Sequence, residues 1–275
     1  MKKILIGLMG LMGIMGMVCC DKIENEERLI IMGDRQDQWA EGSFAYVEKY
    51  TGPLCSNCPM ADRTIENLHH TYGDRMIVVS VTSITNSQGN PYGDEPSMQL
   101  EASRVWEQRY GALALPTAYI NRGDKAYTSS MNDLGGGIEE ALTMEPAVKL
   151  TVEATCGGST VDINTSAELA FDYADPMTLT LLITEDSLAY TQCDGTNVVS
   201  DYVHNHMLRA VVTDSWGKSF DIGTTEGSRK NDHTNYDLGT LTIVPENSHV
   251  VALVCDAATH RVLGCAQCDI RVGTK

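Results

Sequence analysis

Two cysteines at the junction of a strand pattern and a helix pattern constrain the fold of this chain more than any other feature. Cys55 and Cys58 follow residues 44–50, which are rich in aromatic and β-branched residues and predict a strand. Beyond Cys58 the apolar residues take a helical period, with Ala61, Ile65, Leu68 and Tyr72 at steps of four, three and four. Residues 76–82 then predict a second, buried strand. The sequence therefore predicts a parallel strand–helix–strand unit whose helix begins at the cysteines.

The position of these cysteines gives them a chemical rationale. The N-terminus of a helix carries partial positive charge and free N–H groups, which stabilise a thiolate. Cys55 is therefore the candidate nucleophile and Cys58 the candidate resolving thiol. Glu48, on the strand that enters this site, is a candidate for relaying a proton to Cys58; the alternative is that it faces solvent near the sheet edge. Zinc sites share the cysteine spacing but need two further nearby ligands, which the sequence does not supply, so we predict no metal and no cofactor.

A second helix–strand pattern follows this unit. Residues 98–110 form a helical apolar stripe, and residues 116–120 predict a strand that Pro116 opens. A proline that opens a strand after a helix resembles the cis-proline of thioredoxin-like proteins, which packs beside the redox cysteines. We therefore predict a cis peptide bond before Pro116. A hairpin through residues 121–127 and a helix over residues 133–144 complete the predicted N-terminal domain, residues 41–146.

The first residues resemble an export signal that ends in a lipidation site. Lys2 and Lys3 precede an apolar run, residues 4–18, which is too short to span a bilayer comfortably. The run ends in two cysteines and an aspartate, as in the lipobox of bacterial lipoproteins, and Cys20 fits the lipidated position better than Cys19. We predict a signal peptide over residues 1–19, a lipid on Cys20 and an acidic tether over residues 20–40. The compartment is therefore extracytoplasmic, where disulfides persist.

The charge excludes one class of partner. The chain has 37 acidic and 20 basic residues, with a formal net charge of −17. An acidic chain repels nucleic-acid phosphates, so we predict no binding to nucleic acid. Its length of 275 residues fits two domains better than one.

Residues 147–275 predict an all-β domain. Apolar and polar residues alternate from residue 148 to residue 155, and further strands are predicted at residues 177–184, 207–213, 238–243 and 248–255, with a final hairpin to residue 272. Short strands separated by Gly, Asn and Asp favour a Greek-key, immunoglobulin-like sandwich, and a barrel is the alternative.

Histidines and cysteines of the second domain admit several interpretations. His204 and His206 share a face if their segment is extended, but a metal site would need a third ligand, so a structural role is the better prediction. Five cysteines remain in this domain, so at least one has no partner within it. Cys255 with Cys265 is the first pair to test. Cys156 with Cys193 is a weaker hypothesis.

Several of these segments together resemble one protein family. The lipobox, the tether after Cys20, residues 48–59 with their Cys-Ser-Asn-Cys-Pro element, and the His-Asn-His-Met-Leu-Arg element at residues 204–209 are similar to those of the Omp28-related outer membrane lipoproteins of Bacteroidetes. The resemblance covers nearly the whole mature chain. It implies an α/β thioredoxin-like N-terminal domain joined to an all-β sandwich, located at the outer membrane with no settled biochemical activity.

Two functions follow from these observations. The first is a lipid-anchored surface or envelope binding protein in which the Cys55–Cys58 pair is a static disulfide in a rigid scaffold. The alternative is an envelope thiol-disulfide oxidoreductase that uses Cys55, Cys58 and Pro116 and needs no dissociable cofactor. In both cases the partners are the membrane, through the N-terminal lipid, and envelope or host proteins, with the chain facing the periplasm or the cell surface. The sequence leaves the choice open.

Overall fold

The computed structural model describes residues 39–273, except residues 112 and 130. The segment from Trp39 onward is one compact unit. The predicted signal peptide, Cys20 and nearly all of the predicted tether lie outside the described residues. Among the residues described, no helix is both long enough and apolar enough to cross a membrane.

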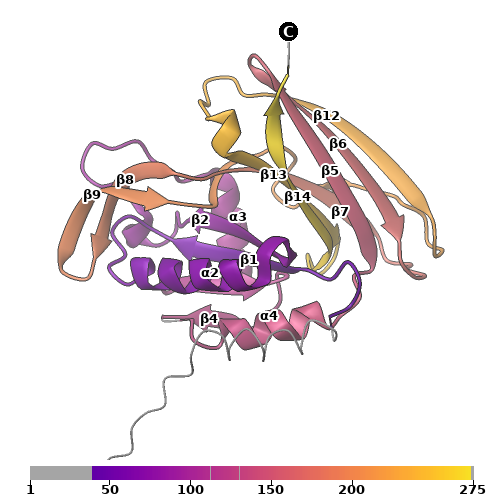
Figure 1. Ribbon diagram of the computed structural model, residues 1–275, viewed down its shortest axis with the longest axis horizontal. Coiled ribbons are helices and arrows are strands. Elements are labelled where there is room, and N and C mark those ends of the chain that lie inside the picture. The colour runs from indigo at the N-terminus through magenta and orange to yellow at the C-terminus, as the bar shows by residue number, and fades with distance from the viewer. Residues whose placement is uncertain (1–38, 112, 130, 274–275) are drawn as a thin grey trace, which may run out of the picture. The chain divides into compact units, whose positions relative to one another are not determined.

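The strand–helix–strand unit predicted around the cysteines is present (Figure 1). Strand β1 (Ala45–Thr51) pairs in parallel with β2 (Met76–Thr82), and α2 (Cys58–Tyr72) connects them. Strand β3 (Thr117–Ile120) is antiparallel to β1 and pairs with the short β4 (Ala126–Thr128). The remaining helices here are α3 (Glu101–Tyr110), α4 (Leu134–Leu142) and the 3₁₀ turns Gly73–Arg75 and Ser87–Gly89.

The rest of the unit is almost entirely β. Its strands are β5 (Val148–Gly157), β6 (Thr160–Leu169), β7 (Met177–Glu185), β8 (Leu188–Asp194), β9 (Asn197–His204), β10 (Met207–Val211), β11 (Lys218–Ser219), β12 (Arg229–Asp237), β13 (Ser248–Asp256) and β14 (Val262–Val272), with a 3₁₀ turn at Pro245–Asn247. Strands β8 and β9 form a separate two-stranded sheet, a hairpin that extends to the left in Figure 1.

The predicted fold class is wrong, because the strands of the two expected domains belong to one sheet. This twelve-stranded mixed sheet has the order β12-β6-β5-β14-β13-β7-β10-β2-β1-β3-β4, with β11 attached to β7. The junction is a parallel pairing of β10 with β2 at Met207 and Ser80, where the Ser80 N–H donates to the His206 carbonyl at 2.7 Å. An α/β thioredoxin-like domain followed by a separate sandwich is therefore not what the chain forms. The period-two patterns identified strands, but they carry no information on which strands are neighbours. The predicted boundary at residues 146 and 147 stays a prediction.

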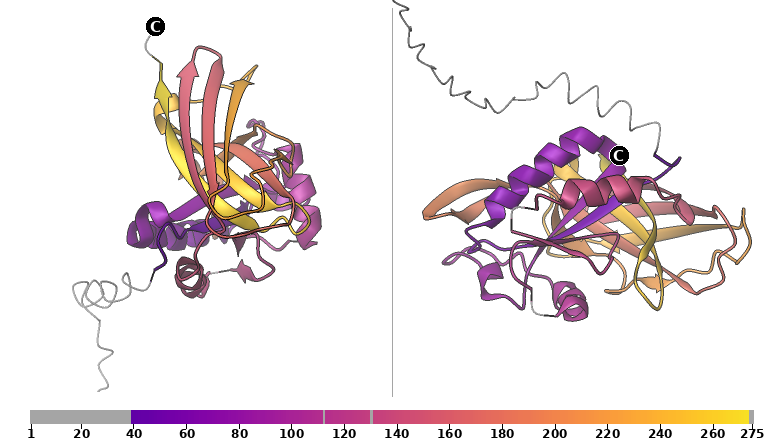
Figure 2. Two further views of the ribbon diagram at one scale, coloured as in Figure 1. Left: turned by 90° about the vertical axis from the view of Figure 1, so that its right-hand side faces the viewer. Right: turned by 90° about the horizontal axis from the view of Figure 1, so that it is seen from below.

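Apolar packing also crosses the expected boundary. One face of β1 and β2 packs on α2 and α4, and Figure 2 shows these helices gathered at one end of the sheet. The opposite face packs on Trp106 of α3 and joins Val251 and Leu253 of β13 in a single core. A third core lies among β5, β6, β7 and β13. The shared core explains why the unit is not divided at β10, since separating the halves would expose fully buried side chains.

Candidate functional site

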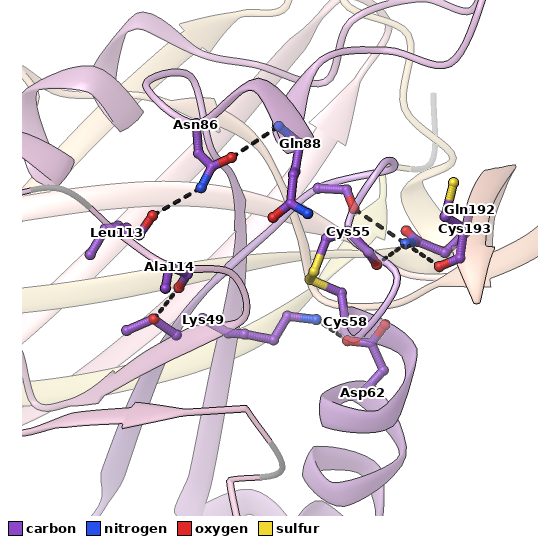
Figure 3. The surroundings of a disulfide bond; sticks show 12 residues. Lys49, Cys55, Cys58, Asp62, Asn86, Gln88, Leu113, Ala114, Gln192 and Cys193 are labelled. Carbon is purple, nitrogen blue, oxygen red and sulfur yellow. Dashed lines mark hydrogen bonds and ion pairs between the residues drawn. A yellow bond between two sulfur atoms is a disulfide. The ribbon is translucent and has the colours of Figure 1, made fainter. Parts of the chain in front are cut away.

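A disulfide joins Cys55 and Cys58 at the start of α2 (Figure 3). The two Cα atoms are 5.4 Å apart, and the Cys58 N–H donates to the Cys55 carbonyl at 3.2 Å. The helix begins at Cys58, as predicted, with Asn57 before it and Pro59 in its first turn, where a missing N–H costs nothing. Cys55 is 1% exposed and Cys58 is fully buried. The sequence located this pair correctly but gave no sign that it is enclosed.

The hairpin of β8 and β9 covers the loop that carries the disulfide. The Gln192 side chain, 1% exposed, donates from Nε2 to the carbonyls of Gly52 at 3.2 Å and of Cys55 at 2.9 Å. Two backbone N–H groups of the hairpin complete the contact: that of Cys193 donates to the Pro53 carbonyl at 2.8 Å, and that of Gly195 to the Ser56 carbonyl at 2.9 Å. Four successive polar contacts therefore hold the hairpin along the loop.

A second loop encloses the disulfide region from the other side. The Leu54 N–H donates to the Gln88 carbonyl at 2.9 Å, and the Asn86 side chain caps the turn by accepting from the Gln88 N–H at 3.0 Å. Asn86 also donates to the Leu113 carbonyl at 2.9 Å (Figure 3). This approach requires glycine at residue 52, because a Cβ there would lie 2.3 Å from the Gln88 carbonyl oxygen.

The predicted cis peptide bond is confirmed at Leu115–Pro116. Pro116 is buried and opens β3 next to β1, since Thr117 pairs with Tyr50. The hydroxyl of Thr117 donates to the Ala114 carbonyl and closes the turn. Pro116 therefore lies on the strand beside the one that leads to the disulfide. Its proposed role in holding a substrate chain stays a prediction.

Glu48 is buried in a polar network and does not face solvent. Its Oε2 accepts from Arg122 Nε at 2.9 Å and from the Tyr46 hydroxyl at 2.9 Å, and its Oε1 accepts from the Tyr50 hydroxyl at 2.7 Å. Burial, followed by the Glu48 carboxylate, raises the pKa of both tyrosines well above its ordinary value. Burial opposes the charge of Arg122, but the Glu48 carboxylate raises the pKa of the guanidinium above its usual range. These contacts use both carboxylate oxygens; the proton-relay role of Glu48 stays a prediction.

Arg122 connects this network to the second half of the sheet. Its guanidinium carbon lies 5.0 Å from the ring centre of Trp106 and 5.1 Å from that of Trp216. One guanidinium nitrogen also lies 3.9 Å from the sulfur of Cys255 on β13. The residue was predicted only as part of a hairpin turn. No local pattern could have identified it as a buried cation, because its partners come from four distant segments.

A second ion pair, with a buried lysine and a partly exposed aspartate, ties β1 to α2 beneath the disulfide. Lys49 pairs with Asp62, and the Tyr202 hydroxyl of β9 donates to the other Asp62 oxygen at 2.9 Å. Figure 3 shows Lys49 reaching toward the helix from the side of the strand. Asp62 lies one turn beyond Cys58, so the pair fixes both the start of the helix and the hairpin above it. Sequence analysis missed all three residues.

The two histidines of the predicted His-Asn-His element point to different partners. His204 is 5% exposed and packs edge-on against Tyr202, with 4.9 Å between ring centres, and burial lowers its pKa to about 4. His206 has a left-handed backbone, and its ring lies 3.6 Å from Asp186 and 3.7 Å from Glu66. Within the described ranges, no three His, Cys, Asp or Glu side chains are grouped so that they could hold a metal ion.

The other five cysteines of residues 39–273 are free thiols. Neither hypothetical pair forms: Cys255, Cys265, Cys156 and Cys193 are all unpaired, as is Cys268. Cys255 and Cys265 both belong to the core that spans the two halves, and burial raises the pKa of the Cys255 thiol to about 11. Buried thiols with a high pKa are unreactive. Cys193, by contrast, is partly exposed, so reagents can reach this thiol.

Comparisons with known proteins give a family from one match and a similar fold from two solved structures. A family model described as outer membrane protein Omp28 matches residues 103–273. The solved structure of HBP35 of Porphyromonas gingivalis is similar, with a TM-score of 0.61 and 16% identity over 83% of this chain and 76% of that chain. Protein AGR_C_4864 of Agrobacterium tumefaciens has a TM-score of 0.52 and 13% identity over 86% of this chain and 98% of that one. No curated protein matches the sequence.

Proposed function

The chain belongs to the Omp28 family of outer membrane proteins, and from this premise we propose that it is a lipid-anchored binding protein of the cell envelope. The family match spans residues 103–273 and places the protein at the outer membrane. In this proposal the Cys55–Cys58 disulfide is a structural cross-link, and the folded unit presents binding surfaces to envelope or host proteins. The net charge of −17 supports protein partners over nucleic acid, whose phosphates an acidic chain repels.

The enclosure of the disulfide is the observation that carries this proposal. Thiol-disulfide exchange requires a thiolate to reach one sulfur from solvent. Here Cys55 is 1% exposed and Cys58 is fully buried, and Gln192 is hydrogen-bonded across the loop between β1 and α2. This buried position supports a structural disulfide that fixes the loop, rather than a catalytic disulfide that exchanges with the thiols of partners.

Resistance of the native disulfide to a reductant tests the proposal. Folded protein is incubated with millimolar dithiothreitol, and new thiols are alkylated and assigned by peptide mass. We expect Cys55 and Cys58 to stay oxidised for hours under native conditions and to be reduced within minutes in urea. The partly exposed thiol of Cys193 serves as the internal control for alkylation. Rapid reduction of the native protein would contradict a structural role.

The alternative function is an envelope thiol-disulfide oxidoreductase. It is supported by the position of the pair at the N-terminus of α2, where the helix dipole favours a Cys55 thiolate once the disulfide is reduced. In cells, Cys58→Ser should then trap mixed disulfides through Cys55, whereas the matched variant Cys193→Ser should trap none beyond the parent. If the disulfide is structural, as we propose, neither variant traps mixed disulfides. Mixed disulfides that form in Cys58→Ser and disappear when Cys55 is also replaced would favour the enzyme.

The lipid anchor on Cys20 is the remaining part of the proposal. A single acyl chain binds membranes only marginally, and the two or three chains of a bacterial lipoprotein give stable anchoring. Cells fed labelled fatty acid should label the parent and Cys19→Ser equally but not Cys20→Ser. Label retained by Cys20→Ser and lost from Cys19→Ser would move the anchor to the neighbouring residue.

A further inference from the structure

The strands that end the sheets differ in how their edges are protected. A free strand edge presents unpaired N–H and C=O groups to other chains, and proteins blunt it by charge, proline, shortness or cover. In the large sheet, β12 carries two basic and two acidic residues along nine positions, and β4 has only three residues. In the small sheet, β8 is covered by the loop that holds the disulfide. These edges are protected in the ordinary ways.

The edge of β9 is uncovered, and a single acidic residue, Asp201, is the one protection of this kind that it carries. The strand is eight residues long, Asn197 to His204, with three valines, one tyrosine and no lysine, arginine or proline. Its only neighbour is β8, and within the described part of the chain its backbone makes no hydrogen bond on the opposite side. Figure 1 shows the hairpin projecting from the body of the molecule, and five of the eight residues of β9 are exposed.

The hairpin register shows which backbone groups point outward. Residues 195 and 196 form the turn, Asp194 faces Asn197, and Cys193 faces Val198. In a two-residue hairpin the residues beside the turn exchange both hydrogen bonds, so the next pair does not bond across the hairpin. The N–H and C=O of Val198 therefore point to the free edge. Its side chain is 53% exposed.

The outer face of β9 defines the chemistry of a matching strand. Tyr202 and His204 lie on the face that contacts α2 and the body, and Val199 shares this face because a register shift in the hairpin places it opposite the buried Gln192. Val198, Asp201 and Val203 are exposed on the other face. Val203 is 54% exposed. Asp201 is exposed, and among the ion pairs of the described residues it takes part in none. The face therefore presents an apolar–acidic–apolar pattern.

We propose that the free edge of β9 binds an extended segment of a partner polypeptide as an added strand, with apolar residues flanking a lysine or arginine opposite Asp201. The segment contributes backbone hydrogen bonds to Val198 and its neighbours, and alternate side chains supply the selectivity. This inference rests on the proposed binding function and gives it a site. A second copy of the chain fits poorly. Antiparallel pairing of two β9 strands about their centres puts the two Asp201 carboxylates on one face, directly opposite or about two positions apart, where like charges repel.

Titration of the ¹⁵N-labelled, folded protein with a short peptide tests the site. The probe is acetyl-Thr-Val-Thr-Lys-Thr-Val-Thr-amide, and its partner peptide carries Glu in place of Lys. We expect amide shifts confined to residues 197–204 and their contacts, and binding of the Glu peptide that is about 2-fold to 10-fold weaker. Val198→Pro removes one outward N–H and should weaken binding about 5-fold, whereas the matched Val198→Thr keeps it. Asp201→Lys should reverse the preference between the peptides.

Three results would overturn the inference. The first is the absence of shifts in residues 197–204 at millimolar peptide. The second is unchanged affinity in Val198→Pro together with unchanged preference in Asp201→Lys; the latter variant decides the question if proline disturbs the hairpin. The third is a dimer in sedimentation that Val198→Pro abolishes, since the occupant would then be a second copy. None of these readouts involves Cys20 or the disulfide. A negative result would therefore reject the β9 site and leave the lipid anchor and the structural cross-link untouched.

Discussion

Removal of the Gln192 side chain should open the cover over the disulfide without unfolding the protein. In Gln192→Ala the carbonyls of Gly52 and Cys55 lose their donor, and both hydrogen bonds are within 3.2 Å in the structure. A hydrogen bond of this kind contributes about 0.5–1.5 kcal/mol net, so the pair contributes about 1–3 kcal/mol to closure of the hairpin. If reduction proceeds through local opening, the population of the open form rises by a factor of about 5 to 150.

The assay is the pseudo-first-order rate of reduction by tris(2-carboxyethyl)phosphine at fixed pH, read by alkylation of Cys55 and Cys58. Urea unfolding of the same variant gives its global stability. The matched control is Gln108→Ala, which removes an exposed glutamine from α3. We expect the variant to be reduced at least about 5-fold faster than the parent and the control.

Two results would refute the reasoning. A rate equal to that of the parent would show that the hairpin does not limit access to the sulfurs. A reduction rate that rises with urea as steeply as global unfolding does would show that reduction requires complete unfolding, in which case Gln192 is an ordinary structural residue.

Three further predictions concern the buried groups. Glu48→Gln should cost about 3–5 kcal/mol in urea unfolding because it leaves Arg122 buried without its carboxylate, and adding Arg122→Met should recover part of that loss. His204 is buried as the neutral imidazole with a pKa of about 4, so its contribution to stability is present above the unfolded pKa of about 6.5 and is lost as pH falls toward 4. The unfolding free energy should therefore drop by about 2.5 kcal/mol more between pH 8 and pH 4.5 in the parent than in His204→Gln; equal drops would contradict a neutral, buried ring. Replacing Cys55 and Cys58 together by serine should lower stability by about 2 kcal/mol, as expected for a short disulfide loop, and a thermal or urea melt that shows no loss would exclude a structural cross-link.

Local sequence signals predicted the elements around the cysteines well. The strand before Cys55, the helix that begins at Cys58 and the parallel strand after it depend on apolar period and on turn residues within a short segment. The cis bond at Pro116 was predicted from a proline at the point where a helix pattern gives way to a strand, together with its resemblance to the cis-proline of thioredoxin-like proteins. The strands and the helix depend on residues that are close in sequence.

The polar strands and the strand neighbours could not be predicted in this way. Strand β12 was missed because its residues are polar on both faces, so it lacks the alternation that marks a half-buried strand. Residues 238–243 were predicted as a strand from their apolar content, yet they form an irregular connection. The pairing of β10 with β2 depends on an exposed edge of β2 and on a core that both halves share. Neither feature leaves a periodic signal.

Access to the disulfide, and with it the choice between cross-link and catalyst, is determined by the part of the chain that sequence analysis described least. A helix N-terminus activates a cysteine in any fold, so the Cys-x-x-Cys element alone is compatible with both functions. What differs is whether a partner can reach the sulfurs, and here that depends on Gln192, which follows Cys55 by 137 residues. The hairpin that supplies Gln192 also carries the uncovered edge of β9. The hairpin therefore covers the disulfide and also presents a strand edge to partners. A partner that binds β9 while the disulfide stays inaccessible would show that the hairpin serves binding and not thiol exchange.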